Sequence, residues 1–240
     1  MNTVLQTRGL TKTYGTVNAL ENVTMTVPNG SIYGFVGKNG SGKTTLMRIV
    51  AGLVFPSGGS FALYGQTGEA GILAARKRMG AVIETPAIFP NMTARDNLKE
   101  QCKLIGCDDN RIDNILITVH LNDTGGKKVK NFSFGMKQRL GIAMALIGEP
   151  DFLMLDEPIN GLDPEGIVEI RELLLRLNQE HGVTILISSH ILSELSKLAT
   201  HYGFIDRGHL LKEMDAKELD GQHNGNLEEY FMDLIRRENQ

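Results

Sequence analysis

The chain has 240 residues, a length that one large α/β domain can reach before a second core forms at roughly 250 to 300 residues. Its formal charge of −3 gives no electrostatic basis for nucleic-acid binding, which is typical of clustered basic surfaces, so we expect no nucleic-acid partner. The longest apolar runs, Phe152 to Leu155 and Val183 to Ile187, fall well short of the roughly 20 residues that cross a bilayer.

The first third of the chain predicts strands followed by a glycine-rich turn. The alternating segments Leu5 to Tyr14 and Ala19 to Val27 predict antiparallel strands joined by a turn at Gly15. The apolar run Ile32 to Val36 predicts a buried strand, and a helix is expected over Thr45 to Ala51. The glycine-rich stretch therefore lies between a strand and a helix.

The middle of the chain predicts a group of helices. Residues Ser60 to Ala81 have the pattern of a strand, a short helix and a strand, with turns before and after the first strand. From Thr93 to His120 the apolar spacing becomes helical. Its predicted faces are Leu98, Cys102 and Ile105 on one side, and Ile112, Ile115, Leu116 and Val119 on the other.

The last part of the chain alternates between the two element types. We predict helices at Met136 to Ile147, Pro164 to Asn178, Ile191 to Leu198 and Leu227 to Arg237, strands at Phe152 to Leu155 and Val183 to Ser188, and two short strands around Asp206-Arg207-Gly208-His209.

The chain has two cysteines, Cys102 and Cys107, on a predicted helix. No signal peptide precedes them, and disulfides are rare in the cytosol. We therefore expect reduced thiols in a cytosolic protein, neither a disulfide nor a metal site.

The stretch GKNGSGKT, Gly37 to Thr44, has the full pattern of a phosphate-binding loop in a strand-to-helix context. Its backbone N–H groups would point into a concavity at a helix N-terminus, which attracts anions. We expect Lys43 to reach the β- and γ-phosphates and the Thr44 hydroxyl to contact Mg²⁺. The nucleotide-binding residues predicted from the loop are Gly37, Asn39, Gly40, Ser41, Gly42, Lys43, Thr44 and Thr45. The sequence therefore predicts binding of a nucleoside triphosphate.

Two carboxylates end the predicted strand at Phe152. Ligands of open α/β sheets bind at the carboxyl ends of the strands, so Asp156 and Glu157 would face the phosphate loop. Asp156 is placed to hold Mg²⁺, directly or through water, and Glu157 could polarise an attacking water. Taken alone, such a pair could equally cap a helix or be solvated.

These residues belong to an ordered set that resembles the ATPase subunit of an ABC transporter. The set comprises GKNGSGKT, NFSFGMKQR at Asn131 to Arg139, LMLDEP at Leu153 to Pro158, NGLD at Asn160 to Asp163, and SSH at Ser188 to His190. The resemblance implies an α/β fold with a P-loop NTPase core, a mixed, mainly parallel sheet, an antiparallel β subdomain and an inserted helical subdomain. It implies one nucleotide-binding domain over residues 1–240, with helices at about 90–150 and terminal strands and a helix at about 200–240.

The resemblance assigns further roles. Tyr14 would stack on adenine, although a partly buried strand tyrosine would read the same way, and His190 would contact the γ-phosphate. Ser133 and Gly135 would bind the γ-phosphate held by a second ATPase subunit, and Asp163 would couple the two subunits. The catalytic residues would be Glu157, His190 and Lys43, and ATP and Mg²⁺ would be the cofactors.

Two positions depart from the family pattern. The commonest signature is LSGGQ, and here Phe134 replaces the first glycine while Ser133 and Gly135 remain. Glu84 stands where the family usually places a glutamine that senses Mg²⁺. A carboxylate is a good ligand for a hard cation, so Glu84 is our third candidate metal residue beside Thr44 and Asp156, the alternative being a solvated loop side chain.

Glu84, the signature and LEEYFMDLI at Leu227 to Ile235 are similar to the bacitracin and lantibiotic self-protection branch. That resemblance implies a peptide-antibiotic exporter in which this subunit, as a homodimer or heterodimer that sandwiches ATP, powers a separate membrane permease. The subunit would be cytoplasmic, on the inner face of the cell membrane. The alternative is a soluble single-domain ABC ATPase that acts as an assembly or regulatory factor without a permease.

Overall fold

The computed structural model describes residues 3–220 and 226–238. The strands are β1 (Thr3–Tyr14), β2 (Val17–Val23), β3 (Thr26–Pro28), β4 (Ile32–Val36), β5 (Gly58–Leu63), β6 (Met79–Val82), β7 (Phe152–Asp156), β8 (Thr184–Ser189), β9 (His201–Asp206) and β10 (His209–Asp215). The α-helices are α1 (Lys43–Ala51), α2 (Gly68–Arg76), α3 (Ala94–Ile105), α4 (Ile112–Thr118), α5 (Phe134–Leu146), α6 (Pro164–Gln179), α7 (Leu192–Leu195), α8 (Ala216–Asp220) and α9 (Leu227–Glu238), with 3₁₀ turns at Asp109–Arg111, Asn122–Thr124 and Val129–Asn131.

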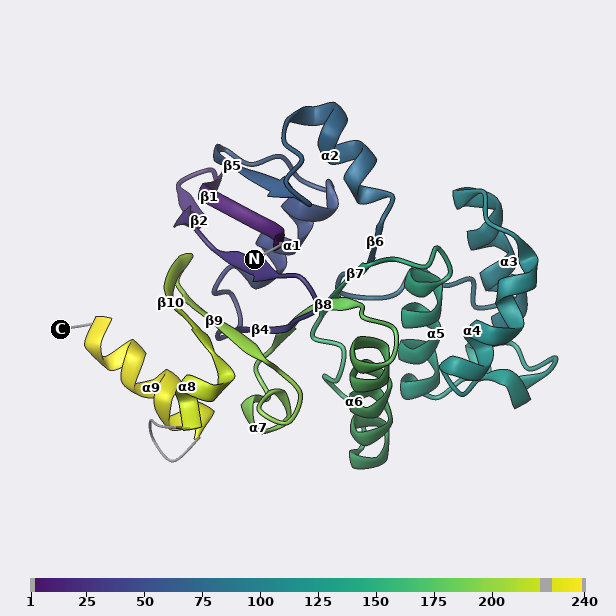
Figure 1. Ribbon diagram of the computed structural model, residues 1–240. Coiled ribbons are helices and arrows are strands. Elements are labelled where there is room, and N and C mark those ends of the chain that lie inside the picture. The colour runs from purple at the N-terminus through teal and green to yellow at the C-terminus, as the bar shows by residue number, and fades with distance from the viewer. Residues whose placement is uncertain (1–2, 221–225, 239–240) are drawn as a thin grey trace.

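A six-stranded sheet in the order β10-β9-β4-β8-β7-β6 forms the centre of the molecule (Figure 1). β4 pairs in parallel with both β8 and β9, and β7 pairs in parallel with β6 and β8, whereas β9 and β10 are antiparallel. Every residue of β4, β7 and β8 is buried, as expected for parallel strands covered on both faces. The predicted mixed, mainly parallel sheet is confirmed.

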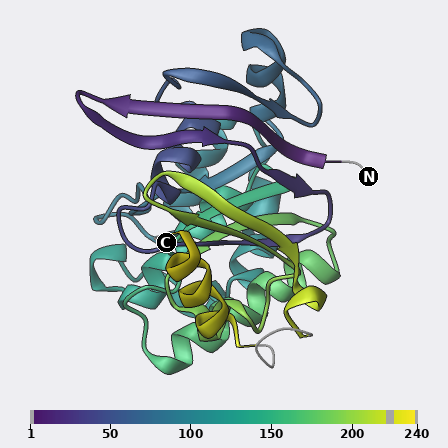
Figure 2. The same ribbon diagram turned by 90° about the vertical axis from the view of Figure 1, so that its left-hand side faces the viewer.

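A second, antiparallel sheet is built around β1, which pairs with β2, β3 and β5. Figure 2 shows this long strand crossing the upper part of the molecule, above the six-stranded sheet. The predicted strand Ala19 to Val27 is two strands, β2 and β3, which are separated at Thr24 and Met25. Asn22, with a φ of 53°, lies at an irregularity in the pairing of β2 with β1. The predicted antiparallel subdomain is therefore confirmed, with a break in its second strand.

Alternating residues of the central strands point into two different cores. Ile32 and Val36 of β4 lie in a core with α5, α6 and α7, whereas Tyr33 and Phe35 lie in a core with α1 and the antiparallel sheet. This follows from the two-residue period of a strand, which sends successive side chains to opposite faces. The two cores hold β4 rigidly, so the loop that follows it leaves the sheet from a fixed point.

Helices α3, α4 and α5 pack against one another at one side of the sheet (Figure 1). Leu98 and Cys102 of α3 are fully buried there. Ile105, predicted on the same face, is 48% exposed. It is the last residue of α3, and the left-handed Gly106 ends the helix there, so no further turn covers it.

The prediction of reduced cysteines is wrong. Cys102 and Cys107 form a disulfide in the structure, with Cα atoms 4.7 Å apart. The cause is local. Gly106 turns the chain back on itself, and the N–H groups of Gly106 and Cys107 both donate to the Cys102 carbonyl, at 2.8 and 3.0 Å. A helix that continued through Cys107 would have kept the two sulfur atoms apart.

Among the remaining elements, α7 is shorter than the predicted Ile191 to Leu198, and α8 was not predicted. Beyond it, the chain turns to the sheet, where Thr200 N donates to Ile32 O at 2.8 Å. None of the helices in the described part of the chain combines the length and the apolarity that crossing a bilayer requires.

Candidate nucleotide site and an adjoining groove

The carboxyl ends of β4, β7 and β8 meet at one edge of the central sheet. In the parallel register, Val36 lies beside Ser189, and Asp156 lies beside Ser188. β4 leads directly into the phosphate loop and α1, so the loop and the two carboxylates that end β7 share this edge. The sheet therefore assembles the predicted motifs although they are far apart in the sequence.

The phosphate loop is held in a shape that only small residues allow. A Cβ atom on Gly37 would lie 2.4 Å from Ser41 Oγ and 2.6 Å from the carbonyl oxygen of Ile205. At the other end, Gly42 precedes α1 with a φ of 112°, and no side chain caps the helix. The first N–H groups of α1 are thus free to bind an anion, and the helix dipole favours negative charge at that point.

Lys43 lies at the centre of this edge with only 5% of its surface exposed. Its Nζ donates to the carbonyl oxygens of Gly37 at 2.6 Å and Lys38 at 3.2 Å. The same ammonium lies 3.4 Å from Glu157 Oε1, an ion pair that lacks hydrogen-bond geometry. The cation is therefore buried inside the loop that wraps around it.

Thr44 and Asp156 form the second contact across this edge. Thr44 Oγ1 donates to Asp156 Oδ2 at 2.7 Å, and Ser188 Oγ donates to Asp156 Oδ1 at 2.6 Å. The Glu157 N–H in turn donates to Ser188 Oγ at 2.9 Å. The hydroxyl and the carboxylate that were predicted to organise Mg²⁺ thus lie side by side, with Ser188 fixing the rotamer of the carboxylate.

Glu157 and His190 form the third contact. Glu157 Oε2 lies 2.8 Å from His190 Nδ1 and accepts from the His190 N–H at 3.3 Å. Glu157 itself has a φ of 51°, a conformation that costs energy for a non-glycine residue and often occurs at functional sites. The carboxylate is thereby held between a cation and an imidazole, at 19% exposure.

The side chains at this edge fit an Mg²⁺ that is shared with phosphate. Mg²⁺ usually takes one or two carboxylates together with waters and substrate phosphates, which matches Thr44 and Asp156. Within the described residues, no three His, Cys, Asp or Glu side chains gather in a way that could hold a metal by themselves. Two buried oxygens at this edge, Ser41 Oγ and Glu157 Oε1, have no hydrogen-bond partner in the described structure, as expected of groups aimed at a ligand.

Not all of the predicted site residues belong to this cluster. Ser133 caps α5 by accepting from Met136 N at 3.2 Å, and Gly135 follows it in the first turn. Asp163 caps α6 by accepting from Gly166 N at 3.0 Å. Tyr14 ends β1 at 45% exposure, with Lys12 Nζ 4.8 Å from the centre of its ring. Asn39 is exposed at the tip of the phosphate loop, and Thr45 is half-buried in α1.

Glu84 lies in the loop after β6 and pairs with Arg48 of α1. Arg48 is four residues after Thr44 and therefore on the same face of the helix, one turn further on. Glu84 is 55% exposed and has a φ of 63°. Its carboxylate thus lies next to the face of α1 that carries Thr44 but bonds to the Arg48 guanidinium there.

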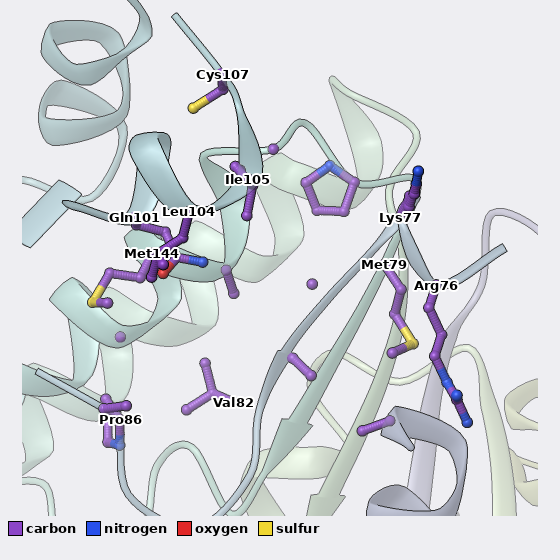
Figure 3. Close-up of a pocket in the computed structure, with 18 of the residues that line it drawn as sticks. Arg76, Lys77, Met79, Val82, Pro86, Gln101, Leu104, Ile105, Cys107 and Met144 are labelled. Atoms are coloured by element: carbon purple, nitrogen blue, oxygen red, sulfur yellow. The ribbon is translucent and has the colours of Figure 1, made fainter. Parts of the chain in front are cut away.

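A groove adjoins this loop between β6 on one side and α3 and α5 on the other, with a volume of about 1140 Å³ (Figure 3). Leu104 and Ile105 lie on its helical side, and Arg76 and Lys77 on the opposite side. Pro86 closes one end by packing on α5 so tightly that a Cβ atom on Gly141 would lie 2.4 Å from it. The groove therefore begins where the Glu84 loop crosses α5.

The sequence analysis missed two residues of this region, Ser188 and Arg48. Ser188 was quoted within the SSH motif without a role, and only the register between β7 and β8 shows that it supports Asp156. Arg48 has no role in the sequence-based predictions, although its spacing of four residues from Thr44 places both on one face of a helix.

Comparison with known proteins agrees with this geometry. Residues 20–160 match the protein family described as "ABC transporter". The chain is 44% identical to the bacitracin transport ATP-binding protein BcrA of Bacillus licheniformis over 229 residues, which is 95% of this chain and 75% of that protein. It is 44% identical to the lantibiotic transport ATP-binding protein SrtF of Streptococcus pyogenes over 232 residues, which is 97% of both chains. A solved ATP-binding subunit of an ABC transporter superposes with a TM-score of 0.83 at 27% identity, covering 97% of this chain and 99% of the other.

Proposed function

The chain belongs to the ABC transporter family as an ATP-binding ATPase subunit, and on this premise we propose which residues carry the reaction and what the subunit drives. The observation that carries the proposal is the buried arrangement at the sheet edge. It places Lys43, Thr44, Asp156, Glu157 and His190 in contact with one another, directly or through Ser188.

We assign phosphate binding to the loop amides and Lys43. The ammonium leaves the carbonyls of Gly37 and Lys38 and donates to the β- and γ-phosphate oxygens, which are stronger acceptors. Thr44 and Asp156 hold Mg²⁺, which supplies charge neutralisation of the phosphates when bound. Glu157 accepts a proton from the attacking water, the His190 ring contacts the γ-phosphate, and the His190 backbone N–H helps to keep Glu157 in place.

We propose that the site is completed by a second ATPase subunit. Ser133 and Gly135 begin α5, a helix of 13 residues with an N-terminus at which a phosphate can bind. In this chain their neighbours are Met136 and Leu162, so they are available for the γ-phosphate held by another subunit. Asp163 and Tyr14 keep their proposed roles in coupling the subunits and stacking on adenine.

We propose that the groove receives a cytoplasmic helical segment of a membrane permease. Its rim presents apolar side chains to solvent, with Leu53 at 67%, Leu104 at 78% and Ile105 at 48% exposure. Their burial against a partner would stabilise a complex by about 1.5–3 kcal/mol for each fully covered side chain. Arg76 donates to the carbonyls of Ile49 and Val50 at the end of α1, so the same surface contacts the helix that begins at Lys43.

Glu84 connects the two sites in this proposal. Its neighbours Ile83 and Thr85 line the groove, while its carboxylate pairs with Arg48 on α1. A surface ion pair contributes only about 0–1 kcal/mol, so Arg48 would not prevent Glu84 from serving as a further oxygen ligand to an Mg²⁺ held by Thr44 and Asp156. The permease and the nucleotide would therefore act on the same loop.

The similarity to bacitracin and lantibiotic transport subunits supports export of a peptide antibiotic as the process that this subunit powers. The ATPase would then work in the cytoplasm, at the inner face of the cell membrane, bound there through its permease.

Replacement of Glu157 with glutamine tests the catalytic assignment. Glutamine keeps the size of the side chain but cannot accept the proton, so we expect kcat to fall by about 10²–10⁴. ATP binding should be unchanged, and the closed dimer should accumulate in sedimentation experiments. Glu172→Gln, at an exposed position on α6, is the matched control. Normal turnover by Glu157→Gln would remove Glu157 from the reaction.

A further inference from the structure

We propose that Phe134 is a positioning residue. It would transmit the binding of a γ-phosphate at the start of α5 to Glu157 of the same chain, through the loop at residues 160–163. The inference rests on the proposed ATP-bridged dimer and adds a direction to it. The phosphate that α5 binds belongs to the nucleotide of the partner subunit, whereas the Glu157 that Phe134 controls acts on the nucleotide of its own subunit.

The contact that carries this inference lies between the start of α5 and the loop after β7. The Phe134 ring packs over the backbone of Gly161, with Cε1 3.6 Å from the position that a Cβ atom would occupy there. Gly135 lies close to the same loop, because a Cβ atom added there would stand 3.6 Å from Leu162 Cδ2. The start of α5 is therefore next to the loop after β7, and the Phe134 ring is the side chain that reaches it.

The loop is joined to Glu157 by short hydrogen-bonded turns. Asn160 N donates to the Glu157 carbonyl at 3.1 Å, and Leu162 N donates to the Ile159 carbonyl at 3.4 Å. Ile159 is buried at 2% exposure, so the loop pivots on a fixed side chain. Glu157, at the start of this turn, has a φ of 51°, so we expect a displacement of the loop to act on a residue that is already held in an unfavourable backbone conformation.

The ring has no evident role in holding the fold together. Phe134 is 55% exposed, and it is Ser133 that caps α5. A smaller side chain at this position would leave α5 capped and would open no internal cavity. What it would remove is the contact with Gly161, so the effect should fall on the orientation of Glu157, where a misplacement of about 1 Å can cost about 10²-fold in rate.

Mixed dimers separate this role from a direct contact with the nucleotide. In the first mixture, the Phe134→Ala chain is combined with about a tenfold excess of the Glu157→Gln chain, so that mass action places most active chains in mixed dimers. In the second, the wild-type chain is combined with the same excess of a Phe134→Ala, Glu157→Gln double variant. The reference is wild type with excess Glu157→Gln, and Ile117→Ala, which removes an apolar side chain that is 58% exposed on α4, is the control for surface truncation.

Coupling within one chain predicts about a tenfold fall of ATP turnover in the first mixture, where Phe134 and the only active Glu157 are on the same chain. It predicts that the second mixture matches the reference. Phe134→Leu, which keeps an apolar contact with Gly161, should restore most of the rate in the first mixture. The concentration of ATP that half-saturates dimer formation should be the same for all of these chains.

Two results would overturn the inference. Loss of turnover in the second mixture but not in the first would make Phe134 a contact to the nucleotide of the partner subunit, and unchanged turnover in both would leave it without a role in the reaction. The Glu157→Gln chain alone, sedimented with ATP, tests the underlying dimer. If it stays monomeric, the proposed function fails and this inference with it; if it dimerises, the mixtures judge Phe134 alone.

Discussion

The sheet edge that carries the nucleotide site, here called the nucleotide edge, and the groove differ in how far their side chains are paired within the chain. At the edge, Lys43 and Asp156 are buried at 5% and 4% exposure, and both are bonded to neighbouring groups of the same chain. At the groove, Leu104 and Ile105 are large apolar side chains left at the surface. The polar side chains of the first region are largely paired within the chain, whereas the second region leaves apolar surface that a partner molecule could cover.

The loop that carries Glu84 is the connection between these two regions. The residues on either side of Glu84 line the groove, and the Glu84 carboxylate pairs with Arg48 of α1, the helix that follows the phosphate loop. Variants that affect one region and spare the other test whether the division is real.

Lys43→Ala should have the largest effect. The variant removes a buried cation for which we propose charge-assisted contacts to phosphate, each contributing about 1.5–3 kcal/mol, so we expect ATP affinity to fall by about 10²-fold or more. Calorimetric titration with Mg-ATP measures this directly. Lys38→Ala, at an exposed position of the same loop, is the control and should bind nearly as the wild type does. Equal affinities for the two variants would contradict the phosphate assignment.

Leu104→Asp should affect the groove and spare the edge. A charge at a position meant to be covered should weaken the complex with the permease by about 10- to 100-fold, because the burial of a leucine contributes about 1.5–3 kcal/mol. The ATPase activity of the isolated subunit should not change. Copurification with the permease and ATP turnover of the isolated subunit are the two measurements. Ile117→Asp is the matched control for both, because Ile117 is exposed on α4 and does not line the groove. A complex that tolerates Leu104→Asp would rule out the groove as the docking surface.

Glu84→Ala should affect both regions, and we expect about a tenfold loss of transport-coupled ATPase activity from the missing metal ligand. Glu84→Gln keeps an oxygen ligand and should retain most of the rate. Arg48→Met breaks the ion pair but leaves the carboxylate free, so it should not lower the rate. If Arg48→Met were as slow as Glu84→Ala, the ion pair itself would be the functional element, and unchanged activity and transport in Glu84→Ala would exclude the sensor role.

Thr93→Ala tests the packing of the helical side and should have the smallest effect. The hydroxyl of Thr93 accepts from Asp96 N at 3.1 Å and the Thr93 N–H donates to Asp96 Oδ2 at 3.2 Å, which together form a capping box on α3. The hydroxyl also donates to Asp96 Oδ2 at 2.7 Å. Its loss should lower the free energy of unfolding by about 1 kcal/mol in denaturant titrations. Thr118→Ala, which removes a hydroxyl bonded only within α4, is the control.

The same pair predicts a pH dependence. The hydrogen bond from the Thr93 side chain, followed by that from its backbone, lowers the pKa of Asp96. A lowered folded pKa stabilises the protein above the unfolded value, which is about 3.9, and this contribution is lost as the pH falls through the folded pKa. The stability difference between the wild type and Thr93→Ala should therefore be full at neutral pH and shrink in acid. A difference that grew in acid would contradict the capping box.

The elements of the nucleotide edge could be predicted because their signals are local. The strand Ile32 to Val36 has the same bounds in the structure, and the helix after the glycine loop differs from its prediction by two residues at its start. Buried parallel strands are continuous apolar runs, and a phosphate loop is one contiguous motif, so both can be recognised without knowledge of their neighbours.

What could not be predicted depends on tertiary register and on chain reversals. The support of Asp156 by Ser188 needs the alignment of β7 with β8, and the packing of Phe134 on Gly161 needs the position of α5 beside the loop after β7. The exposure of Ile105 and the disulfide of Cys102 with Cys107 both follow from Gly106, the left-handed glycine that ends α3. The groove carries no motif, since its lining comes from β6, α3 and α5, which meet only in the folded chain.

The central claim is that this subunit powers a separate membrane permease, and an affinity purification tests it most directly. The tagged Glu157→Gln chain is recovered from its native cells in mild detergent with ATP, and the copurifying proteins are identified by mass spectrometry. The account predicts a multi-span membrane protein in comparable amount, lost when Leu104→Asp is added. Recovery of soluble partners alone, from membranes that are fully extracted, would contradict it and favour an assembly or regulatory ATPase that works without a permease.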